Sequence, residues 1–168
     1  MPDGPVVCDT GPLIALTLID QLQILHRLYP RVLVPRAVLD EVTAGGVNRP
    51  GASAIIGAEW LVALDDIAPD PLLAGELGPG EASVIAAAYR LQARLAVLDE
   101  RKARRIAARA YGLRVKGTAG ILVAAKRAGL IAEVRPLLAS MVGKGYFLSR
   151  RLIARAASEA GEETNTRS

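Results

Sequence analysis

The chain has 168 residues, of which 51% are apolar and 23% charged, so its composition is that of a globular domain and not of a disordered segment. Lysine and arginine outnumber aspartate and glutamate by 21 to 17, a mild excess that permits a polyanionic partner without requiring one. The single cysteine, Cys8, excludes an internal disulfide and a cysteine-based zinc cage, and it fits a reducing compartment.

The N-terminal segment does not have the pattern of a signal peptide. It carries Asp3 in place of a cationic run, and Asp9 and Gly11 interrupt its apolar stretch. No uninterrupted apolar run reaches the roughly 18 residues of a membrane span. We therefore expect a cytoplasmic protein without a membrane partner, built as one domain over residues 1–160 with a flexible tail over 161–168.

The first half of the chain alternates short apolar runs with helical periodicity. In chain order the pattern predicts a strand over 6–8, helices over about 10–20 and 22–30, a strand over 32–34, a helix over about 35–44, a short helix ending near 58 and a weaker strand over 60–64. Thr10 is predicted to cap the first helix.

The second half begins with a predicted surface loop over 65–80, a segment rich in proline, glycine and aspartate. It continues with a helix over 81–90, a strand over 95–98, a basic helix over 101–111, a strand over 113–115, and helices over about 119–128, 134–142 and 149–160. Short apolar strands that alternate with helices predict parallel βαβ units and an α/β fold with a helix-covered sheet.

Two aspartates follow apolar strands directly. Asp9 ends the first predicted strand and Asp99 the fourth, while Thr118 follows the fifth. Because ligands of parallel sheets bind beyond the carboxyl ends of the strands, the functional site is expected at these residues. Paired carboxylates beside buried backbone need a cationic partner. A chain with one histidine, His26, points to a hard divalent ion held by oxygen ligands.

Two further acids stand where they can face the same site. Glu41 lies one or two turns into the helix after the second strand, and Glu81 opens the helix after Gly78-Pro79-Gly80. Four carboxylates suit Mg²⁺ or Mn²⁺ and leave positions for water and phosphate. Such a site can hydrolyse a phosphodiester, because a bound metal ion activates water and polarises the phosphoryl group.

Each acid also has a purely structural interpretation. Asp9 and Asp99 can cap helices, and Glu41 and Glu81 can be solvated helix residues or partners of the helix dipole. Glu100 adjoins Asp99 and is an alternative ligand. An aspartic protease is disfavoured because helical periodicity follows Asp9 at once. A haloacid-dehalogenase phosphatase is disfavoured because the position two residues after Asp9 is a glycine.

Five segments in this order resemble the PIN family, and specifically its toxin-type, VapC-like ribonuclease branch. They are Val6 to Leu16, Val34 to Val42, Leu77 to Ala82, Val97 to Arg104 and Val115 to Leu122. The resemblance covers nearly the whole chain from about residue 5 to 160. The chain departs from the commonest toxin pattern by having glutamate at position 81 and an Asp-Glu pair at 99–100.

The resemblance implies a three-layer α/β/α sandwich with a short parallel sheet of Rossmann-like topology. It also implies cleavage of single-stranded RNA with Mg²⁺ or Mn²⁺, a homodimer and a small antitoxin partner. The positions that match the family's catalytic and metal-binding acids are Asp9, Glu41, Glu81 and Asp99. Thr10 and Thr118 match hydroxyl positions that steady a carboxylate or a water, and Glu100 is a further supporting candidate.

A basic cluster follows Asp99 and is predicted to contact RNA phosphates; its members are Arg101, Lys102, Arg104 and Arg105, with Arg36 as a weaker candidate. The alternative is a solvated helix face. Two rival functions stay open: a non-catalytic PIN-like module that binds RNA or protein, and a nucleotide-binding Rossmann-like domain. The nucleotide-binding domain is disfavoured because no strand is followed by a Walker or Gly-x-Gly-x-x-Gly sequence.

Overall fold

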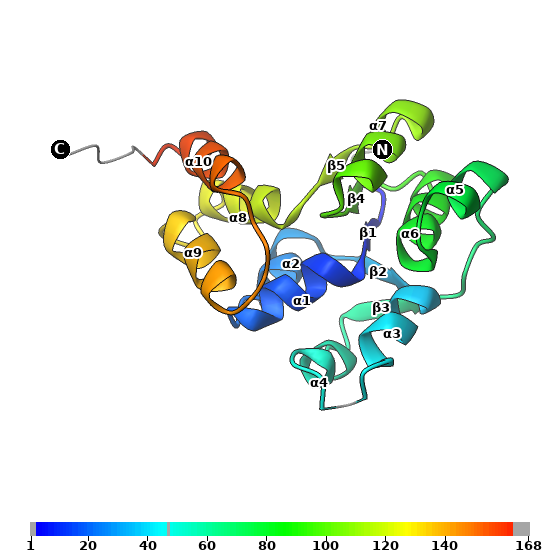
Figure 1. Cartoon of the computed structure of the whole chain (residues 1–168), viewed down its shortest axis with the longest axis horizontal. Coiled ribbons are helices and arrows are strands. Elements are labelled where there is room, and N and C mark those ends of the chain that lie inside the picture. The colour runs from blue at the N-terminus through cyan, green and yellow to red at the C-terminus, as the bar shows by residue number, and fades with distance from the viewer. Residues whose placement is uncertain (1–2, 47, 163–168) are drawn as a thin grey trace.

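The computed structural model describes residues 3–46 and 48–162. Within these residues one sheet contains five parallel strands in the order β3-β2-β1-β4-β5. The strands are β1 (Val6–Cys8), β2 (Val32–Pro35), β3 (Leu61–Leu64), β4 (Leu95–Val97) and β5 (Val115–Lys116). Because all pairings are parallel, the carboxyl ends of all five strands lie along one edge of the sheet (Figure 1).

Helices cover both faces of the sheet. They are α1 (Thr10–Leu18), α2 (Gln23–Leu28), α3 (Arg36–Thr43), α4 (Ala52–Ile56), α5 (Pro71–Glu76), α6 (Pro79–Arg90), α7 (Arg101–Tyr111), α8 (Thr118–Arg127), α9 (Arg135–Gly143) and α10 (Arg150–Glu159). On one side α6 packs on β1, β2 and β4, with α3, α5 and α7 around it. On the other side α8 packs on α1, α2 and α10, and α9 packs on α10 (Figure 1). The predicted three-layer α/β/α sandwich is confirmed.

The strand sequences explain this layering. Every residue of β1, β2 and β4 is buried, as expected for strands with helices on both faces, whereas β3 at the edge is half-exposed. The buried core is built from leucine, isoleucine, valine and alanine, and Tyr29 is the only aromatic residue in the core of the described chain. Alanine-rich α6 is buried along most of its length, so it can lie close against the strands.

Two local predictions were wrong. The segment 65–80 was expected to be a loop, but it contains α5, which begins at Pro71 and buries Leu73. Asp70 caps this helix by accepting a hydrogen bond from the Leu73 backbone N–H at 3.0 Å. Proline at the first helical position favours a helix start, so the same residue that suggested a loop begins the helix. Thr10 is not the cap of α1 but its first residue, and Asp9 precedes it at the N-cap position.

The C-terminal helices belong to the body of the domain. In the tail predicted over 161–168, the Glu162 carboxylate accepts hydrogen bonds from Lys126 Nζ and from the Arg135 backbone N–H, both at 3.0 Å. Residues 163–168 of the predicted tail lie outside the described residues. No helix among the described residues combines the length and the apolar character needed to cross a membrane.

Candidate active site

The two aspartates predicted from strand ends lie on neighbouring strands. Asp9 follows β1 and Asp99 follows β4 by two residues, and these strands pair in register with Cys8 opposite Val97. The Asp9 backbone N–H donates a hydrogen bond to the Val97 carbonyl at 3.0 Å. In the sheet, β2 and β3 lie on one side of β1, and β4 and β5 lie on the other. The pair therefore lies at the topological switch point, where open α/β sheets bind ligands.

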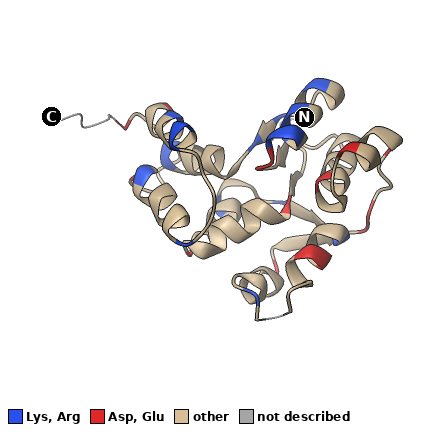
Figure 2. Cartoon of the chain, viewed as in Figure 1, with Lys and Arg blue, Asp and Glu red and all other residues tan. Residues whose placement is uncertain are grey.

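One cleft of about 470 Å³ brings these aspartates together with the other predicted acids. We call it the acid cleft; its lining residues are Asp9, Thr10, Gly11, Glu41, Glu81, Asp99, Glu100, Tyr146 and Phe147. They come from the β1–α1 junction, α3, the start of α6, the β4–α7 loop and the α9–α10 loop. Figure 2 shows acidic positions just before α1, on α3, at the start of α6 and just before α7 around the same region.

Asp9 is the most buried acid of the cleft, with 7% of its surface exposed. Its Oδ1 atom is buried and has no hydrogen-bond partner within the described part of the chain, and its side chain makes no capping bond to α1. Burial raises the pKa of Asp9 to about 7, and the nearby carboxylates of Glu81 and Glu41 add to the effect. The capping interpretation therefore fails for Asp9, and a buried oxygen remains that a cation can satisfy.

Glu41 is held in place by both of its oxygens. Thr10 Oγ1 donates to Glu41 Oε2 at 3.0 Å, and the Gly80 backbone N–H donates to Glu41 Oε1 at 2.9 Å. A Cβ atom on Gly80 would lie only 2.4 Å from Glu41 Oε1, so a glycine is required for this approach. The hydrogen bond to Glu41 is the contact through which Thr10 would play its predicted supporting role.

Glu81 and Glu100 combine cleft lining with helix capping. Glu81 Oε2 accepts a hydrogen bond from the Gly78 backbone N–H at 3.1 Å, at the start of α6. Burial raises the pKa of Glu81, with further contributions from the Glu100 and Glu41 charges. Glu100 accepts from the backbone N–H groups of Lys102 and Ala103 at 2.9 and 2.7 Å, so Glu100, not Asp99, caps α7.

Asp99 receives three hydrogen bonds. The backbone N–H and the hydroxyl of Thr118 donate to its two oxygens at 2.7 and 2.5 Å, and the Tyr146 hydroxyl donates to Oδ2. Burial and the Asp99 carboxylate raise the pKa of Tyr146 well above its usual range, so this hydroxyl stays protonated and remains a donor. Thr118 is fully buried, and its predicted supporting role stays a prediction.

Tyr146 and Phe147 are cleft residues that the sequence analysis missed. They lie in the loop between α9 and α10, and Tyr146 is 47 positions from the aspartate it contacts. Phe147 is 88% exposed at the edge of the cleft. Two adjacent aromatic residues after Gly145, in a chain with 4% aromatics, were the available signal.

A family model described as PIN domain matches residues 5–162 of this chain. The chain belongs to the PIN-domain family. A search of curated proteins finds no match to it. PIN domains are generally nucleases that use divalent metal ions, so this membership supports a nuclease-type hydrolase and suggests RNA as the substrate. The toxin-type branch, the antitoxin partner and the homodimer stay predictions.

The predicted RNA-binding residues of this PIN domain lie on two helices, with Arg36 on α3 and the others on α7. Arg36 forms an ion pair with Asp65 at 3.5 Å, and Lys102 forms one with Glu76 at 2.7 Å. Arg101 and Arg105 are exposed on α7, and Arg104 is half-buried and lines a second pocket. The described lining of the acid cleft includes no lysine, arginine or histidine, so its negative charge has no cationic side chain within it.

The chemistry of the cleft fits a divalent cation. All of its charged donors are carboxylates, the ligand type that Mg²⁺ and Mn²⁺ prefer, and Asp9 Oδ1 has no other partner among the described residues. Across residues 3–46 and 48–162, however, no three histidine, cysteine, aspartate or glutamate side chains lie close enough to hold one ion as they stand. Because carboxylates repel one another, we expect Asp9 and Glu81 to rotate toward a cation when it binds.

Proposed function

We propose that this PIN domain is a metal-dependent endoribonuclease that cleaves single-stranded RNA, with Asp9, Glu41, Glu81 and Asp99 as the catalytic, metal-binding acids. The observation that supports this most strongly is the convergence of these four acids on the acid cleft, at the switch point of the sheet, with a buried Asp9 oxygen lacking a partner among the described residues. A Mg²⁺ or Mn²⁺ ion bound there supplies Lewis-acid chemistry for phosphodiester hydrolysis.

The protein side chains divide the remaining work. Hydrogen bonds fix Glu41 and Asp99 in position, with Thr10, Gly80, Thr118 and Tyr146 as donors. Glu81 uses one oxygen to cap α6, and its Oε1 makes no hydrogen bond to a described residue. We assign to Glu81 the role of accepting a proton from the attacking water, because Glu81 lines the cleft and one of its oxygens has no hydrogen bond to a described residue.

We extend the proposal to a toxin of a toxin–antitoxin pair that forms a homodimer and is neutralised by a small antitoxin. The support for this is the resemblance of the five sequence segments to toxin-type PIN proteins. Expression of the chain alone is expected to arrest growth of the host cell, and Asp9→Asn is expected to relieve the arrest. Light scattering of the purified protein tests the dimer, and a monomer at micromolar concentration would contradict it.

A second candidate function is a non-catalytic PIN-like module that binds RNA or protein. The observation that favours it is that no three acids of the described chain are already arranged around one point. The two candidates differ in one outcome, which is cleavage of RNA in the presence of Mn²⁺.

The test uses a closed circular single-stranded RNA, which only an endonuclease can open. Wild type with Mn²⁺ is expected to linearise it, EDTA to stop the reaction, and Asp9→Asn to abolish it. Asp40→Asn is the matched control, because Asp40 is an exposed aspartate beside Glu41 and outside the cleft. Intact circles with folded wild type and Mn²⁺ would favour the binding module.

A further inference from the structure

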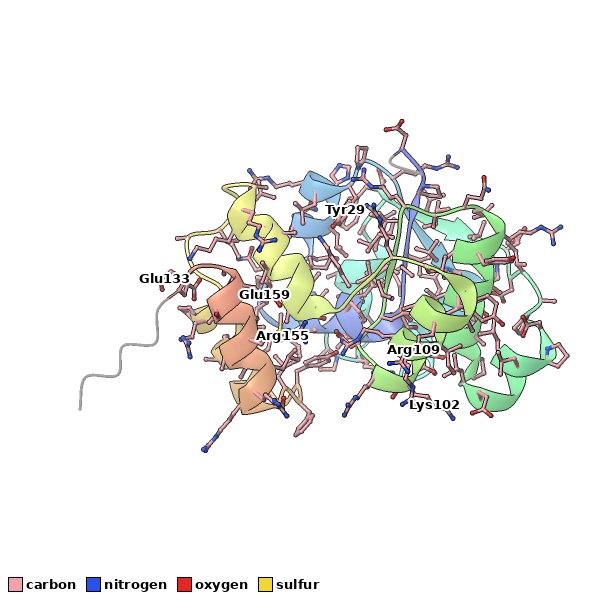
Figure 3. The ribbon with its side chains drawn as sticks, turned by 90° about the horizontal axis from the view of Figure 1, so that it is seen from above. Tyr29, Lys102, Arg109, Glu133, Arg155 and Glu159 are labelled. Atoms are coloured by element: carbon pink, nitrogen blue, oxygen red, sulfur yellow. The ribbon has the colours of Figure 1, made fainter. Side chains whose placement is uncertain are left out.

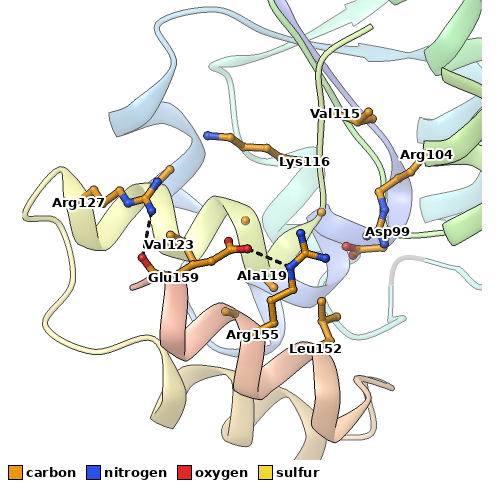
Figure 4. Close-up of a pocket in the computed structure, with 14 residues that line it drawn as sticks. Asp99, Arg104, Val115, Lys116, Ala119, Val123, Arg127, Leu152, Arg155 and Glu159 are labelled. Atoms are coloured by element: carbon orange, nitrogen blue, oxygen red, sulfur yellow. Dashed lines mark hydrogen bonds and ion pairs between the residues drawn. The ribbon is translucent and has the colours of Figure 1, made fainter. Parts of the chain in front are cut away.

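A second pocket lies directly beside the acid cleft and carries the opposite charge. It has a volume of about 300 Å³ and is bounded by β5, α7, α8 and α10 (Figure 4). We call it the basic pocket, after the four cationic residues that line it, which are Arg104, Lys116, Arg127 and Arg155. Two acids also line it: Glu159 and Asp99, the latter shared with the acid cleft.

The positive charge of the basic pocket is only partly balanced. Arg155 Nε pairs with Glu159 Oε1 at 3.0 Å, and Arg127 Nη2 donates to the Glu159 backbone carbonyl at 3.0 Å. Within the described residues Arg104, Lys116 and Arg127 form no ion pair with a carboxylate. The pocket therefore gathers cations that lack a counter-charge.

The surroundings of Lys116 disfavour its positive charge. Its burial, together with the nearby positive charges of Arg127 and Arg94, lowers its pKa. An anion in the pocket would reverse the repulsion between these side chains. Small residues leave room for one, since Gly117, Ala119, Gly120, Ala124 and Ala156 form part of the wall.

Gly117 connects the two sites. A Cβ atom at this position would lie 2.7 Å from Arg104 Nη1 and 2.8 Å from Asp99 Oδ1. Because position 117 has no side chain, the guanidinium of the basic pocket and a carboxylate of the acid cleft can both approach this point of the backbone. A ligand that fills the basic pocket would end beside the acid cleft.

We propose that the basic pocket binds a phosphate group of the single-stranded RNA, next to the phosphate that is cleaved in the acid cleft. This inference rests on the proposed function. Guanidinium groups present paired N–H donors that match phosphate oxygens, and three of the four cations here are arginines. An acid cleft repels the backbone of its own substrate, so a neighbouring site of positive charge has to hold the strand.

The test measures binding of a fluorescently labelled single-stranded oligoribonucleotide in EDTA, where no metal-dependent cleavage takes place. Each charge-assisted contact is worth about tenfold in Kd, so Arg127→Gln combined with Arg155→Gln is expected to weaken binding by roughly 10- to 100-fold. The dependence of log Kd on log salt should become less steep, because fewer counterions are released. Thermal melts establish that the double variant is folded.

Two further variants sharpen the test. Arg109→Gln removes one exposed arginine from α7. Figure 3 shows Arg109 apart from Arg155 and Glu159 of α10, so this variant should bind RNA with a Kd within about twofold of wild type. Glu159→Gln removes a negative charge from the pocket and should tighten binding several-fold. That gain is expected even if the double variant loses stability, so the proposal does not depend on one variant.

The outcomes separate this inference from the proposed function. A double variant with the Kd and salt slope of wild type, or a Glu159→Gln variant with unchanged Kd, would overturn the phosphate site while leaving RNA cleavage untouched. Loss of binding in the double variant, with intact circular RNA in every Mn²⁺ assay, would support the pocket and refute the ribonuclease. Wild type that binds no RNA in EDTA would overturn the phosphate site, while the circular-RNA assay with Mn²⁺ decides the ribonuclease.

Discussion

The acid cleft and the basic pocket lie side by side and share Asp99, yet they differ in how their charges are balanced. In the acid cleft five carboxylates meet without a cationic side chain among the described lining residues, and Asp9 is nearly fully buried. In the basic pocket four cations face two acids, and Arg127 and Arg155 are exposed to solvent. Burial keeps water from satisfying the Asp9 carboxylate, so a bound cation would stabilise it. Solvent, by contrast, can satisfy the exposed cations of the basic pocket until an anion binds.

The largest expected effect comes from titrating Asp9 without metal. Its pKa is raised from 3.8 to about 7, so the folded state binds this proton more tightly than the unfolded state. Stability from this source is present at low pH and is lost as pH rises from about 4 through about 7. In EDTA, denaturant unfolding should show wild type losing stability relative to Asp9→Asn over this interval, by at most on the order of 4 kcal/mol. Parallel profiles for the two proteins would show that Asp9 is not strained by burial.

Displacement of Glu41 is expected to have the next largest effect. In Gly80→Ala the new methyl group overlaps Glu41 Oε1, so the carboxylate must leave its place and cleavage should fall by about a hundredfold. The cleavage rate of circular RNA with Mn²⁺ measures this. Gly75→Ala in α5 is the control, since nothing lies within 4 Å of a Cβ there. Equal activity of the two variants would show that the position of Glu41 does not matter for cleavage.

The smallest expected effect concerns the boundary between cleft and pocket. Tyr146→Phe removes one of three hydrogen bonds to Asp99 and keeps the ring, so cleavage and Mn²⁺ affinity should each fall by about tenfold. Tyr89→Phe, at a tyrosine that is 60% exposed, is the matched control. A Tyr146→Phe variant with a lower melting temperature but unchanged Mn²⁺ affinity would reduce Tyr146 to a packing role.

The sheet, and the location of two acids at the ends of its strands, could be predicted from the sequence for a simple physical reason. Fully buried strands are short apolar runs, and Asp9 and Asp99 interrupt such runs where a parallel sheet binds ligands. Glu41 and Glu81 depended on the family resemblance, because helical glutamates have no distinguishing local pattern. Their place in the cleft follows from the packing of α3 on α6, which periodicity alone does not specify.

Features made by distant segments escaped prediction. Tyr146 reaches Asp99 from a loop, and the basic pocket forms only when α10 packs on α8. In the basic run after Asp99, Lys102 pairs with Glu76 and Arg104 lines the basic pocket, while Arg101 and Arg105 are exposed, so contact of this run with RNA stays a prediction.

Binding of a divalent metal ion in the acid cleft through Asp9 can be measured by calorimetric titration of Mn²⁺ into metal-free protein. At pH 8 wild type and the Asp40→Asn control should bind with the same affinity. Asp9→Asn, equally folded by circular dichroism, should bind at least about tenfold more weakly, because a neutral amide replaces a carboxylate ligand. Wild-type affinity in Asp9→Asn, or no binding by folded wild type, would show that Asp9 does not hold a metal ion in the cleft.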